Sequence, residues 1–153
     1  PIPQELIDKL QKSSHFNQGF ATTEFMAAAL LDMAYHTVKT TEPIHVEKFE
    51  KETLDKLGLI PEITVRYRST YFSHIFDSGY SAGYYAYTWA EVLDADAFQA
   101  FKETGDIFNP EKALAFRQYV LAKGGSDDAM KLYREFRGKD PSIEPLLKRR
   151  GLN

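Results

Sequence analysis

Residues Tyr71–Trp89 read YFSHIFDSGYSAGYYAYTW and contain five of the nine tyrosines of the chain, together with its only tryptophan. A helix beginning at Tyr80 would place Tyr80, Tyr84 and Tyr87 on one face, because these residues stand at positions i, i+4 and i+7. Their hydroxyls would then form a row of hydrogen-bond donors. We therefore expect the rest of the fold to be organised around this stretch.

Two further features of this stretch bear on its function. Asp77–Gly79 has the composition of a loop, and His74 precedes it, so the histidine could fold back toward the tyrosines. Gly83 lies inside the predicted helix, where glycine costs about 1 kcal/mol relative to alanine and usually has a packing or functional reason. Aromatic residues at helical spacing are also typical of a packed core. Residue types alone leave both interpretations open.

Most of the remaining sequence is typical of helices joined by short turns. Phe25–Val38 is rich in strong helix formers and nearly apolar all round, which predicts a helix capped by Thr22 or Thr23 and buried in a bundle. Thr64–Tyr71 favours an extended conformation but is too short to support a sheet. The other predicted helices cover residues 4–11, 43–57, 80–93, 110–123, 126–137 and 143–150, with a separate turn or helix around Phe98 and Phe101.

The boundaries of these helices follow from capping residues. Asn109 with Pro110 is a typical helix start, while Gly58 and Gly138 follow typical helix ends. The basic run Lys148–Arg150 suits the negative end of a helix dipole. Because no repeat, low-complexity tract or flexible linker interrupts the pattern, residues 1–153 are predicted to form a single all-α domain, a multi-helix bundle.

Composition restricts the class of protein. The net charge of −3 argues against a nucleic acid or an anionic membrane as partner, since both require a basic surface. The absence of cysteine excludes disulfides and thiolate metal sites, and fits a reducing compartment. No apolar run is long enough to span a membrane, and no signal peptide opens the sequence. We expect a cytoplasmic location, with the periplasm as the alternative.

No complete catalytic motif is present. The four histidines do not form the pair one helical turn apart that a zinc site typically uses, and there is no HExxH. The glycine motifs of serine hydrolases and phosphate-binding proteins are also missing. By residue chemistry alone, the chain lacks a complete active site.

The Tyr71–Trp89 stretch resembles the C-terminal signature of the thimet-oligopeptidase family of HExxH zinc peptidases, specifically its bacterial peptidyl-dipeptidase (Dcp) branch. The resemblance covers nearly the whole chain, in the order expected for that branch. It is carried also by Phe16–Gly19 (FNQG), Ala28–Met33 (AALLDM), Arg66–Ser69 (RYRS), Leu132–Gly138 (LYREFRG) and Arg150–Asn153 (RGLN). What the chain resembles is only the last part of a much longer helical enzyme.

The resemblance implies that one part of that enzyme supplies the metal ligands and another part supplies hydrogen bonds to the substrate. Zinc would be held by the HExxH histidines and a downstream glutamate, all lying before Pro1, so none of the metal ligands is expected in this chain. By position, Tyr87 matches the tyrosine that donates to the tetrahedral oxyanion, and Tyr80 matches a second donor. His74 matches a histidine that binds substrate or the same intermediate. Gly79 and Tyr84 match the substrate-binding loop and pocket.

The resemblance is imperfect at one loop. Members of the family usually have more glycine there than Asp77–Gly79 provides, which would restrict loop motion or add an acidic group near the peptide. Arg66 and Arg68 could each bind the C-terminal carboxylate of a substrate, as a dipeptide-releasing enzyme requires. Surface or structural ion pairing is the alternative for both arginines.

Three functional hypotheses follow. The first is the C-terminal portion of a zinc peptidyl-dipeptidase acting on oligopeptides, inactive and free of zinc when isolated from the HExxH-bearing remainder of its polypeptide. The second is a fragment of an endo-acting oligopeptidase. The third is a non-catalytic helical module that holds peptides on its aromatic row. An HExxH upstream in the same reading frame would dispose of the third.

Overall fold

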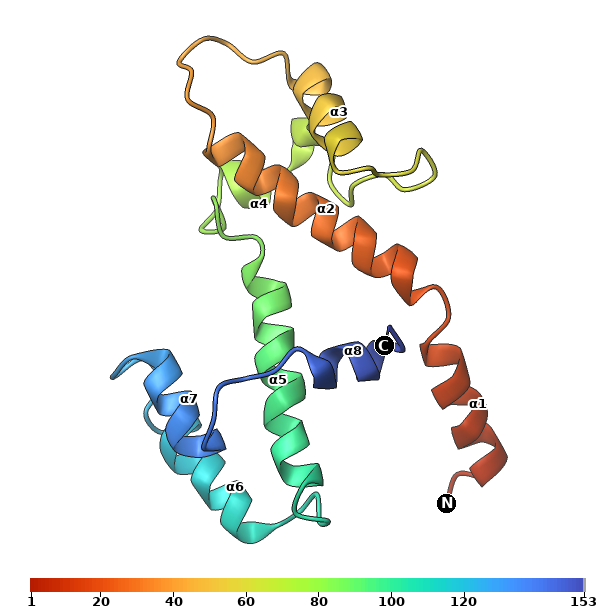
Figure 1. Cartoon of the computed structure of the whole chain (residues 1–153), viewed down its shortest axis with the longest axis vertical. Coiled ribbons are helices and arrows are strands. Elements are labelled where there is room, and N and C mark those ends of the chain that lie inside the picture. The colour runs from red at the N-terminus through yellow and green to blue at the C-terminus, as the bar shows by residue number, and fades with distance from the viewer. Residues whose placement is uncertain (153) are drawn as a thin grey trace. The chain divides into compact units, whose positions relative to one another are not determined.

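The computed structural model describes residues 1–152, and within them the chain forms helices and turns without any β-strand (Figure 1). This confirms the predicted all-α class. A short 3₁₀ helix, Ser69–Tyr71, and a π-helical segment, Arg117–Leu121, accompany the α-helices. The α-helices are α1 (Gln4–Ser14), α2 (Gln18–His36), α3 (Val46–Lys56), α4 (Ser73–Phe76), α5 (Ala86–Lys102), α6 (Pro110–Phe116), α7 (Ala129–Arg137) and α8 (Glu144–Arg150).

The chain divides into two compact units. The first unit runs from Pro1 to Tyr87, and the second begins at Thr88. The single domain predicted for residues 1–153 therefore stays a prediction. None of the helices described in residues 1–152 has the length and apolar character needed to cross a membrane.

The core of the first unit is built on α2. Its small residues Ala28 and Ala29 are 0% and 2% exposed and let Phe72 and Ile75 pack closely against the helix. On the neighbouring face, Leu31 packs with residues of α3 and of the segment that follows it. The buried part of α2 is its middle, Ala27–Ala29 with Leu31 and Asp32, while Phe20 and Leu30 are exposed. The predicted burial of this helix is therefore confirmed only in part.

The start of α2 differs from the prediction. The helix begins at Gln18, about one turn before the predicted caps Thr22 and Thr23. Asn17 is its N-terminal flanking residue and has a left-handed backbone with φ of 57°. Asparagine tolerates this conformation better than most residues, so the chain can turn into the helix there. The prediction that Thr22 or Thr23 caps α2 is therefore wrong.

The start of α3 and the segment after it also differ from the predictions. The helix begins at Val46 instead of Pro43, because the ring nitrogen Nδ1 of His45 accepts the Lys48 amide at 3.4 Å and caps the helix there. The predicted extended segment Thr64–Tyr71 is irregular and ends in the 3₁₀ helix. No neighbouring strand is available in the described residues to pair with an extended segment.

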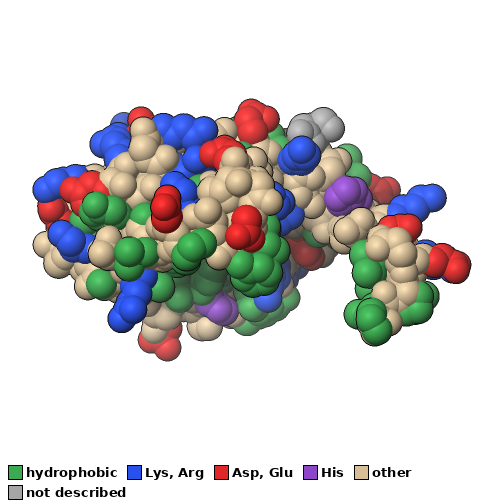
Figure 2. Space-filling model, turned by 90° about the horizontal axis from the view of Figure 1, so that it is seen from below, with side chains coloured by type: hydrophobic (Ala, Val, Ile, Leu, Met, Phe, Trp, Pro, Cys, Tyr) green, Lys and Arg blue, Asp and Glu red, His purple; other side chains and the backbone are tan. Residues whose placement is uncertain are grey.

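The helix α1 buries none of its residues, although its composition is amphipathic. Leu6 and Leu10 are both exposed. Figure 2 shows hydrophobic and charged side chains together on this helix, at the right of the view. The ion pair between Lys9 and Glu5, at 2.6 Å, supports the helix from one turn to the next.

The helix α5, most of which belongs to the second unit, is continuous. The predicted break before Phe98 is wrong, because no glycine or proline interrupts Ala86–Lys102. Ala97 and Ala100 of α5 pack against Tyr133 and Phe136 of α7. A second group joins Val92, Ala95 and Leu146, the last from α8.

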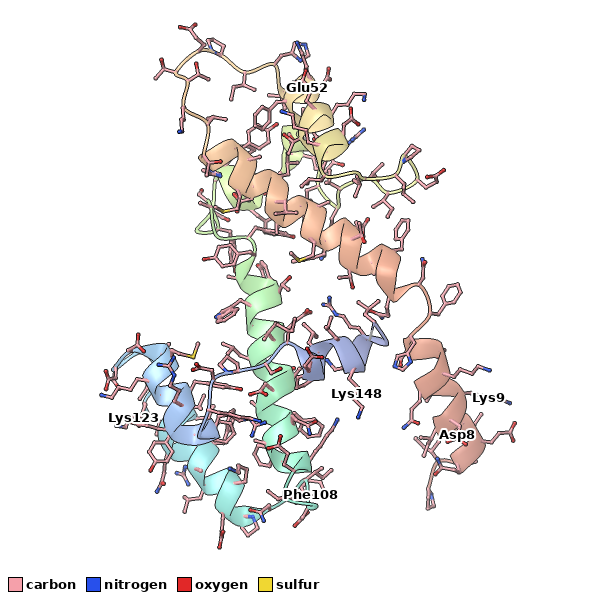
Figure 3. All side chains as sticks on the ribbon, in the orientation of Figure 1. Asp8, Lys9, Glu52, Phe108, Lys123 and Lys148 are labelled. Atoms are coloured by element: carbon pink, nitrogen blue, oxygen red, sulfur yellow. The ribbon has the colours of Figure 1, made fainter. Side chains whose placement is uncertain are left out.

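The predicted start of α6 at Pro110 and the predicted end of α7 at Arg137 are confirmed, whereas α7 begins at Ala129, three residues after its predicted start. The Asn109 side chain accepts the Lys112 amide at 2.9 Å and caps α6, while Phe108 beside it is 82% exposed (Figure 3). Asp128 caps α7 in the same way, and Gly138 ends it with φ of 79°. The predicted helix from Pro110 to Lys123 is instead α6 followed by the π-helical segment. In that segment the Ala122 amide donates to the Arg117 carbonyl at 2.8 Å.

Candidate functional site

His74, Tyr80, Tyr84 and Tyr87 come together in the first unit, and we call these four side chains the His–Tyr cluster. The rings of Tyr80 and Tyr87 stack with centroids 5.0 Å apart, and Tyr84 meets Tyr87 edge-on at 5.4 Å. The His74 ring lies 5.8 Å from that of Tyr84 and 6.2 Å from that of Tyr80. The structure thus brings together the imidazole and phenol side chains singled out in the sequence.

The cluster is not built on one helical face. Residues 80–85 form turns, and α5 begins only at Ala86, so the predicted helix from Tyr80 is wrong. Within this turn Ala82 has a left-handed backbone with φ of 54°. This conformation costs an alanine roughly 1–2 kcal/mol and interrupts a right-handed helix. The turn, in place of a regular helix, brings Tyr80 onto Tyr87.

A buried aspartate in α2 holds this turn. Asp32 is 0% exposed, and its two carboxylate oxygens each accept one backbone amide, from Ala82 and from Tyr84, both at 2.9 Å. A buried carboxylate is costly unless it is paired and hydrogen-bonded. The two amides and the neighbouring His36 ring, 2.8 Å away, provide those partners.

The phenols of Tyr80 and Tyr87 are both accessible. Tyr80 is 37% exposed and Tyr87 is 40% exposed. The pKa of Tyr87 is raised to about 12. The largest cause is a hydrogen bond with Tyr80, and the second largest is desolvation. Since a phenol donates a hydrogen bond only while it keeps its proton, Tyr87 is a competent donor well beyond neutral pH.

Tyr84 occupies a different environment. It is 2% exposed, stacks on Phe25 with centroids 5.2 Å apart, and meets Phe72 edge-on at 4.9 Å. Burial raises its pKa, while the charge of Arg66 opposes that shift. Its buried ring contacts the rings of His74 and Tyr87. Its assignment to the substrate pocket stays a prediction.

His74 lies on α4 between aromatic rings. Its nearest ring neighbour is Tyr67, at 4.8 Å, a residue that the sequence analysis did not assign to the site. Its Nδ1 atom is buried and has no hydrogen-bond partner among the described residues. A buried ring nitrogen without a partner is expensive, and such groups often mark a site completed by something else.

The loop between His74 and Tyr80 has the turn chemistry predicted for Asp77–Gly79. The Ser78 hydroxyl donates to the His74 carbonyl, and the Ser81 hydroxyl donates to the Ile75 carbonyl at 2.6 Å. Gly79, however, does not have a positive φ, and a Cβ there would meet open space. The residue with the left-handed backbone in this stretch is Ala82 instead.

The sequence suggested a packing or functional reason for a glycine at position 83. The structure shows no steric requirement for glycine there. It lies in the turn, and a Cβ there would contact backbone atoms of Tyr80 and Ser81 at 3.6–3.8 Å. These are ordinary van der Waals distances. The close approach therefore does not exclude an alanine at this position.

The two candidate arginines have different surroundings. The Arg68 Nη1 atom pairs with Glu50 at 2.6 Å, so structural ion pairing, the alternative considered for both arginines, accounts for Arg68. Arg66 is exposed, and its guanidinium lies 5.4 Å from the Tyr67 ring centroid. Within residues 1–152 it forms no ion pair with a carboxylate.

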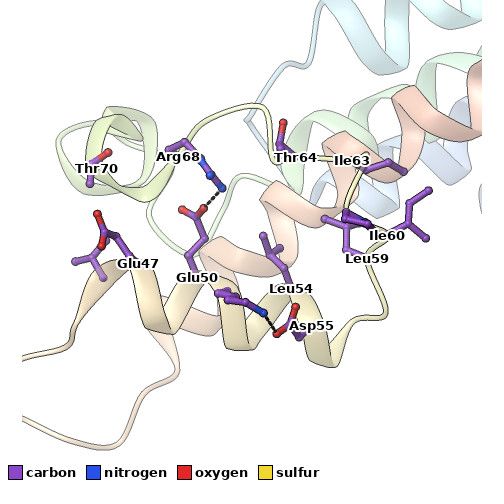
Figure 4. A pocket seen from close by; sticks show the side chains of 13 residues that line it. Glu47, Glu50, Leu54, Asp55, Leu59, Ile60, Ile63, Thr64, Arg68 and Thr70 are labelled. Atoms are coloured by element: carbon purple, nitrogen blue, oxygen red, sulfur yellow. Dashed lines mark hydrogen bonds and ion pairs between the residues drawn. The ribbon is translucent and has the colours of Figure 1, made fainter.

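A cavity of about 540 Å³ lies elsewhere in the first unit, between α3 and the segment that follows it (Figure 4). Several of its polar residues are already engaged: Glu50 accepts both the amide and the hydroxyl of Ser69, at 2.8 and 2.7 Å, besides its pair with Arg68. Lys51 pairs with Asp55. Glu50, Arg68 and Lys51 are thus committed to structural pairs, and the His–Tyr cluster is the better candidate site.

The described residues do not fit a metal site. In residues 1–152 no three histidine, aspartate or glutamate side chains lie close enough together to hold an ion. The sequence also contains no cysteine. Zinc requires such a set of ligands on one site. Any zinc chemistry would have to rest on ligands from outside these residues.

The sequence of this chain matches a known class of peptidases. The sequence model of peptidase family M3 matches residues 1–152, and the chain belongs to this family. It is 45% identical over 154 residues to the dipeptidyl carboxypeptidase of Escherichia coli. It is 34% identical over 153 residues to oligopeptidase A of Haemophilus influenzae, and 39% over 155 residues to an organellar oligopeptidase A of Arabidopsis thaliana.

These matches cover unequal shares of the proteins compared. Each includes 99% of this chain, but only 22%, 22% and 20%, respectively, of those three relatives. The chain thus spans about a fifth of the length of the curated relatives that it matches.

Proposed function

We propose that this chain is the part of a zinc-dependent peptidyl-dipeptidase that binds the peptide and stabilises the oxyanion formed during its hydrolysis. The observation that carries the proposal is the stacked pair Tyr80 and Tyr87, two partly exposed phenols beside His74. Membership of peptidase family M3 and the similarity to a dipeptidyl carboxypeptidase support the reaction class. The activity belongs to the full-length protein, not to this chain alone.

In the proposed mechanism Tyr87 donates a hydrogen bond to the oxygen on which negative charge develops. The Tyr80 ring stacks on that of Tyr87, with centroids 5.0 Å apart, and its hydroxyl can act as a second donor. His74 binds the peptide backbone or the same oxygen through its ring. Such donors act when they are fixed in advance where charge will appear, and losing one typically costs about 2.7–4 kcal/mol of transition-state stabilisation.

Zinc would be held by the remainder of the polypeptide, where the family resemblance places an HExxH segment. When bound, such an ion polarises the scissile carbonyl and activates water. The residues of this chain contribute the hydrogen bonds on the peptide and exclude part of the solvent.

Arg66 is the candidate for recognition of a substrate C-terminus. In the full-length protein, Arg66→Ala is expected to raise KM for peptides with a free C-terminal carboxylate, because an arginine–carboxylate hydrogen bond is lost. Peptides with an amidated C-terminus should show little change. The matched control is Arg68→Ala, since Glu50 already pairs with Arg68. Equal effects of Arg66→Ala on both kinds of peptide would rule out this role.

The Tyr80–Tyr87 hydrogen bond predicts that the alkaline limb of the pH–activity profile shifts when Tyr80 is replaced. Tyr87 donates only below its pKa, which the bond raises to about 12. In Tyr80→Phe that support is lost, the pKa of Tyr87 falls toward its ordinary value of about 10, and activity should decline at lower pH than in the wild type. A pH profile of kcat checks this result. Tyr71→Phe, at an exposed tyrosine outside the cluster, should leave the limb in place.

The test of the proposed function is digestion of oligopeptides by the purified full-length protein. Release of C-terminal dipeptides from free but not amidated peptides, abolished by zinc chelation and restored by zinc, is the expected result. Cleavage of internal bonds regardless of the C-terminus would support the oligopeptidase alternative, which similarity to the oligopeptidases A favours. Tight peptide binding without products would indicate a binding module and overturn the proposal.

A further inference from the structure

We propose that Asp32 is a positioning residue of the candidate site, because its buried carboxylate fixes the turn that brings Tyr80 onto Tyr87. The inference rests on the proposed function for its effect on activity. Asp32 acts through the backbone between the two tyrosines and need not touch the substrate. Nothing in the local sequence around the tyrosines would identify it, since the contacts join positions 50 and 52 residues apart.

The contacts are directed at the backbone of the turn. Oδ1 of Asp32 accepts the Ala82 amide and Oδ2 accepts the Tyr84 amide, each at 2.9 Å. Both amides lie between Tyr80 and Tyr87 in the sequence. A carboxylate that binds two amides with separate oxygens constrains their relative orientation as well as their position. The turn is thereby tied to the buried centre of α2.

The carboxylate is itself oriented. The Nδ1 atom of His36 lies 2.8 Å from Oδ1 of Asp32 and 2.9 Å from the Asp32 backbone oxygen. Because both oxygens are acceptors, this nitrogen carries the hydrogen and donates to them. His36 lies one turn further along α2, so the helix fixes the distance between the two side chains. Asp32 is therefore held rigidly enough to serve as an anchor.

The conformation that Asp32 secures is one that the local sequence does not favour. Ala82 has φ of 54°, in the left-handed region that alanine rarely adopts. Such residues persist where the surrounding structure dictates them, and they concentrate at functional sites. If the anchor weakens, Ala82 can return to negative φ, and Tyr80 and Tyr84 then move relative to Tyr87.

Other buried carboxylates of the chain have different partners. Asp96 accepts hydrogen bonds from the side chains of Tyr133 and Arg137, both in α7, and Glu50 binds Arg68 and Ser69. Neither binds a backbone amide of residues 80–87. Asp96 thus offers a matched comparison: a fully buried aspartate whose loss should affect stability without moving the turn.

The experiment replaces Asp32 by asparagine in the full-length protein. Asparagine has a single acceptor oxygen, so one of the two turn amides is left without a partner. We expect kcat to fall roughly 100-fold, the scale of a misplacement of about 1 Å, with a smaller change in KM. Hydrogen exchange at the Ala82 or Tyr84 amide should become faster. Asp96→Asn should lower Tm while keeping kcat and the exchange of these two amides at wild-type values.

Substitutions at Ala82 test the same conformation from the side of the turn. Ala82 is exposed, so a larger side chain has space. Ala82→Gly, which adopts positive φ freely, should keep wild-type kcat and restore part of the activity lost in Asp32→Asn. Ala82→Val, made in the protein that keeps Asp32, should lower kcat, because valine disfavours positive φ. Rescue by Ala82→Gly would not occur if Asp32 served only general stability.

The outcomes separate this inference from the proposed function. If Tyr87→Phe leaves kcat unchanged, the proposed function fails. If Tyr87→Phe lowers kcat while a folded Asp32→Asn protein keeps wild-type kcat and amide exchange, only the positioning inference is overturned. Should Asp32→Asn not fold, the comparison of Ala82→Gly with Ala82→Val decides: equal kcat in the two would overturn the inference.

Discussion

Tyr87→Phe in the full-length protein is expected to lower kcat about 100- to 1,000-fold while changing KM little. The substitution removes a single hydroxyl from a ring that stays stacked on Tyr80 and in edge-on contact with Tyr84. The lost hydrogen bond forms fully only when charge develops on the substrate oxygen, so the loss falls on the transition state, at about 2.7–4 kcal/mol. Steady-state kinetics on a short oligopeptide measure it.

Two controls make this result specific. Zinc content by elemental analysis should equal that of the wild type, because the proposed zinc ligands lie in the remainder of the polypeptide. Tyr85→Phe removes a hydroxyl from a half-exposed tyrosine two residues away and should keep wild-type kcat. An unchanged kcat in Tyr87→Phe, with zinc retained, would remove Tyr87 from the oxyanion role.

Some helix boundaries could be predicted because a residue next to the helix end decides them, although the cap formed by His45 was not predicted. Asn109 caps α6 with its own carboxamide oxygen, three residues before the amide that it accepts. Gly138 ends α7 because glycine readily adopts the left-handed backbone conformation that stops a helix. No contact with a distant part of the chain is required. In each case the deciding atoms lie within one helical turn, so the sequence pattern contains them.

The turn at residues 80–85 could not be predicted in this way. Read locally, the alanine- and tyrosine-rich run after Gly79 is compatible with a helix that continues into α5. The deciding contacts come from Asp32, some fifty residues earlier. Local propensity is a weak prior that tertiary contacts can override, and here two amide bonds to a buried carboxylate do so.

The candidate site was only partly predictable for the same reason. The family resemblance named His74 and the tyrosines, but not Tyr67, whose ring is the nearest to His74. One signal pointing to Asp32 was available: it is the only charged residue in the apolar run Phe25–Tyr35. A lone carboxylate on the buried part of a helix requires partners from elsewhere in the fold. That requirement indicates that partners exist, without identifying them.

The largest effect on stability is expected at Arg137, on α7 in the second unit. Its Nε atom lies 3.0 Å from Asp96, and its Nη1 and Nη2 atoms bind Glu103 at 2.6 and 2.8 Å. The side chains of Arg137 and Asp96 are only 5% and 1% exposed. Arg137→Leu would leave Asp96 buried with Tyr133 as its one remaining side-chain partner among the described residues. The expected cost is about 3–5 kcal/mol.

Urea unfolding of the full-length protein, followed by circular dichroism, measures this cost against two comparisons. Arg134→Leu removes an exposed arginine of the same helix, whose pair with Asp140 is solvent-screened, and should cost at most about 1 kcal/mol. The double variant Asp96→Asn with Arg137→Leu should regain part of the lost stability, because the uncompensated buried charge is gone. If the double variant were no more stable than Arg137→Leu, the loss would come from packing of the arginine side chain instead of from the stranded carboxylate.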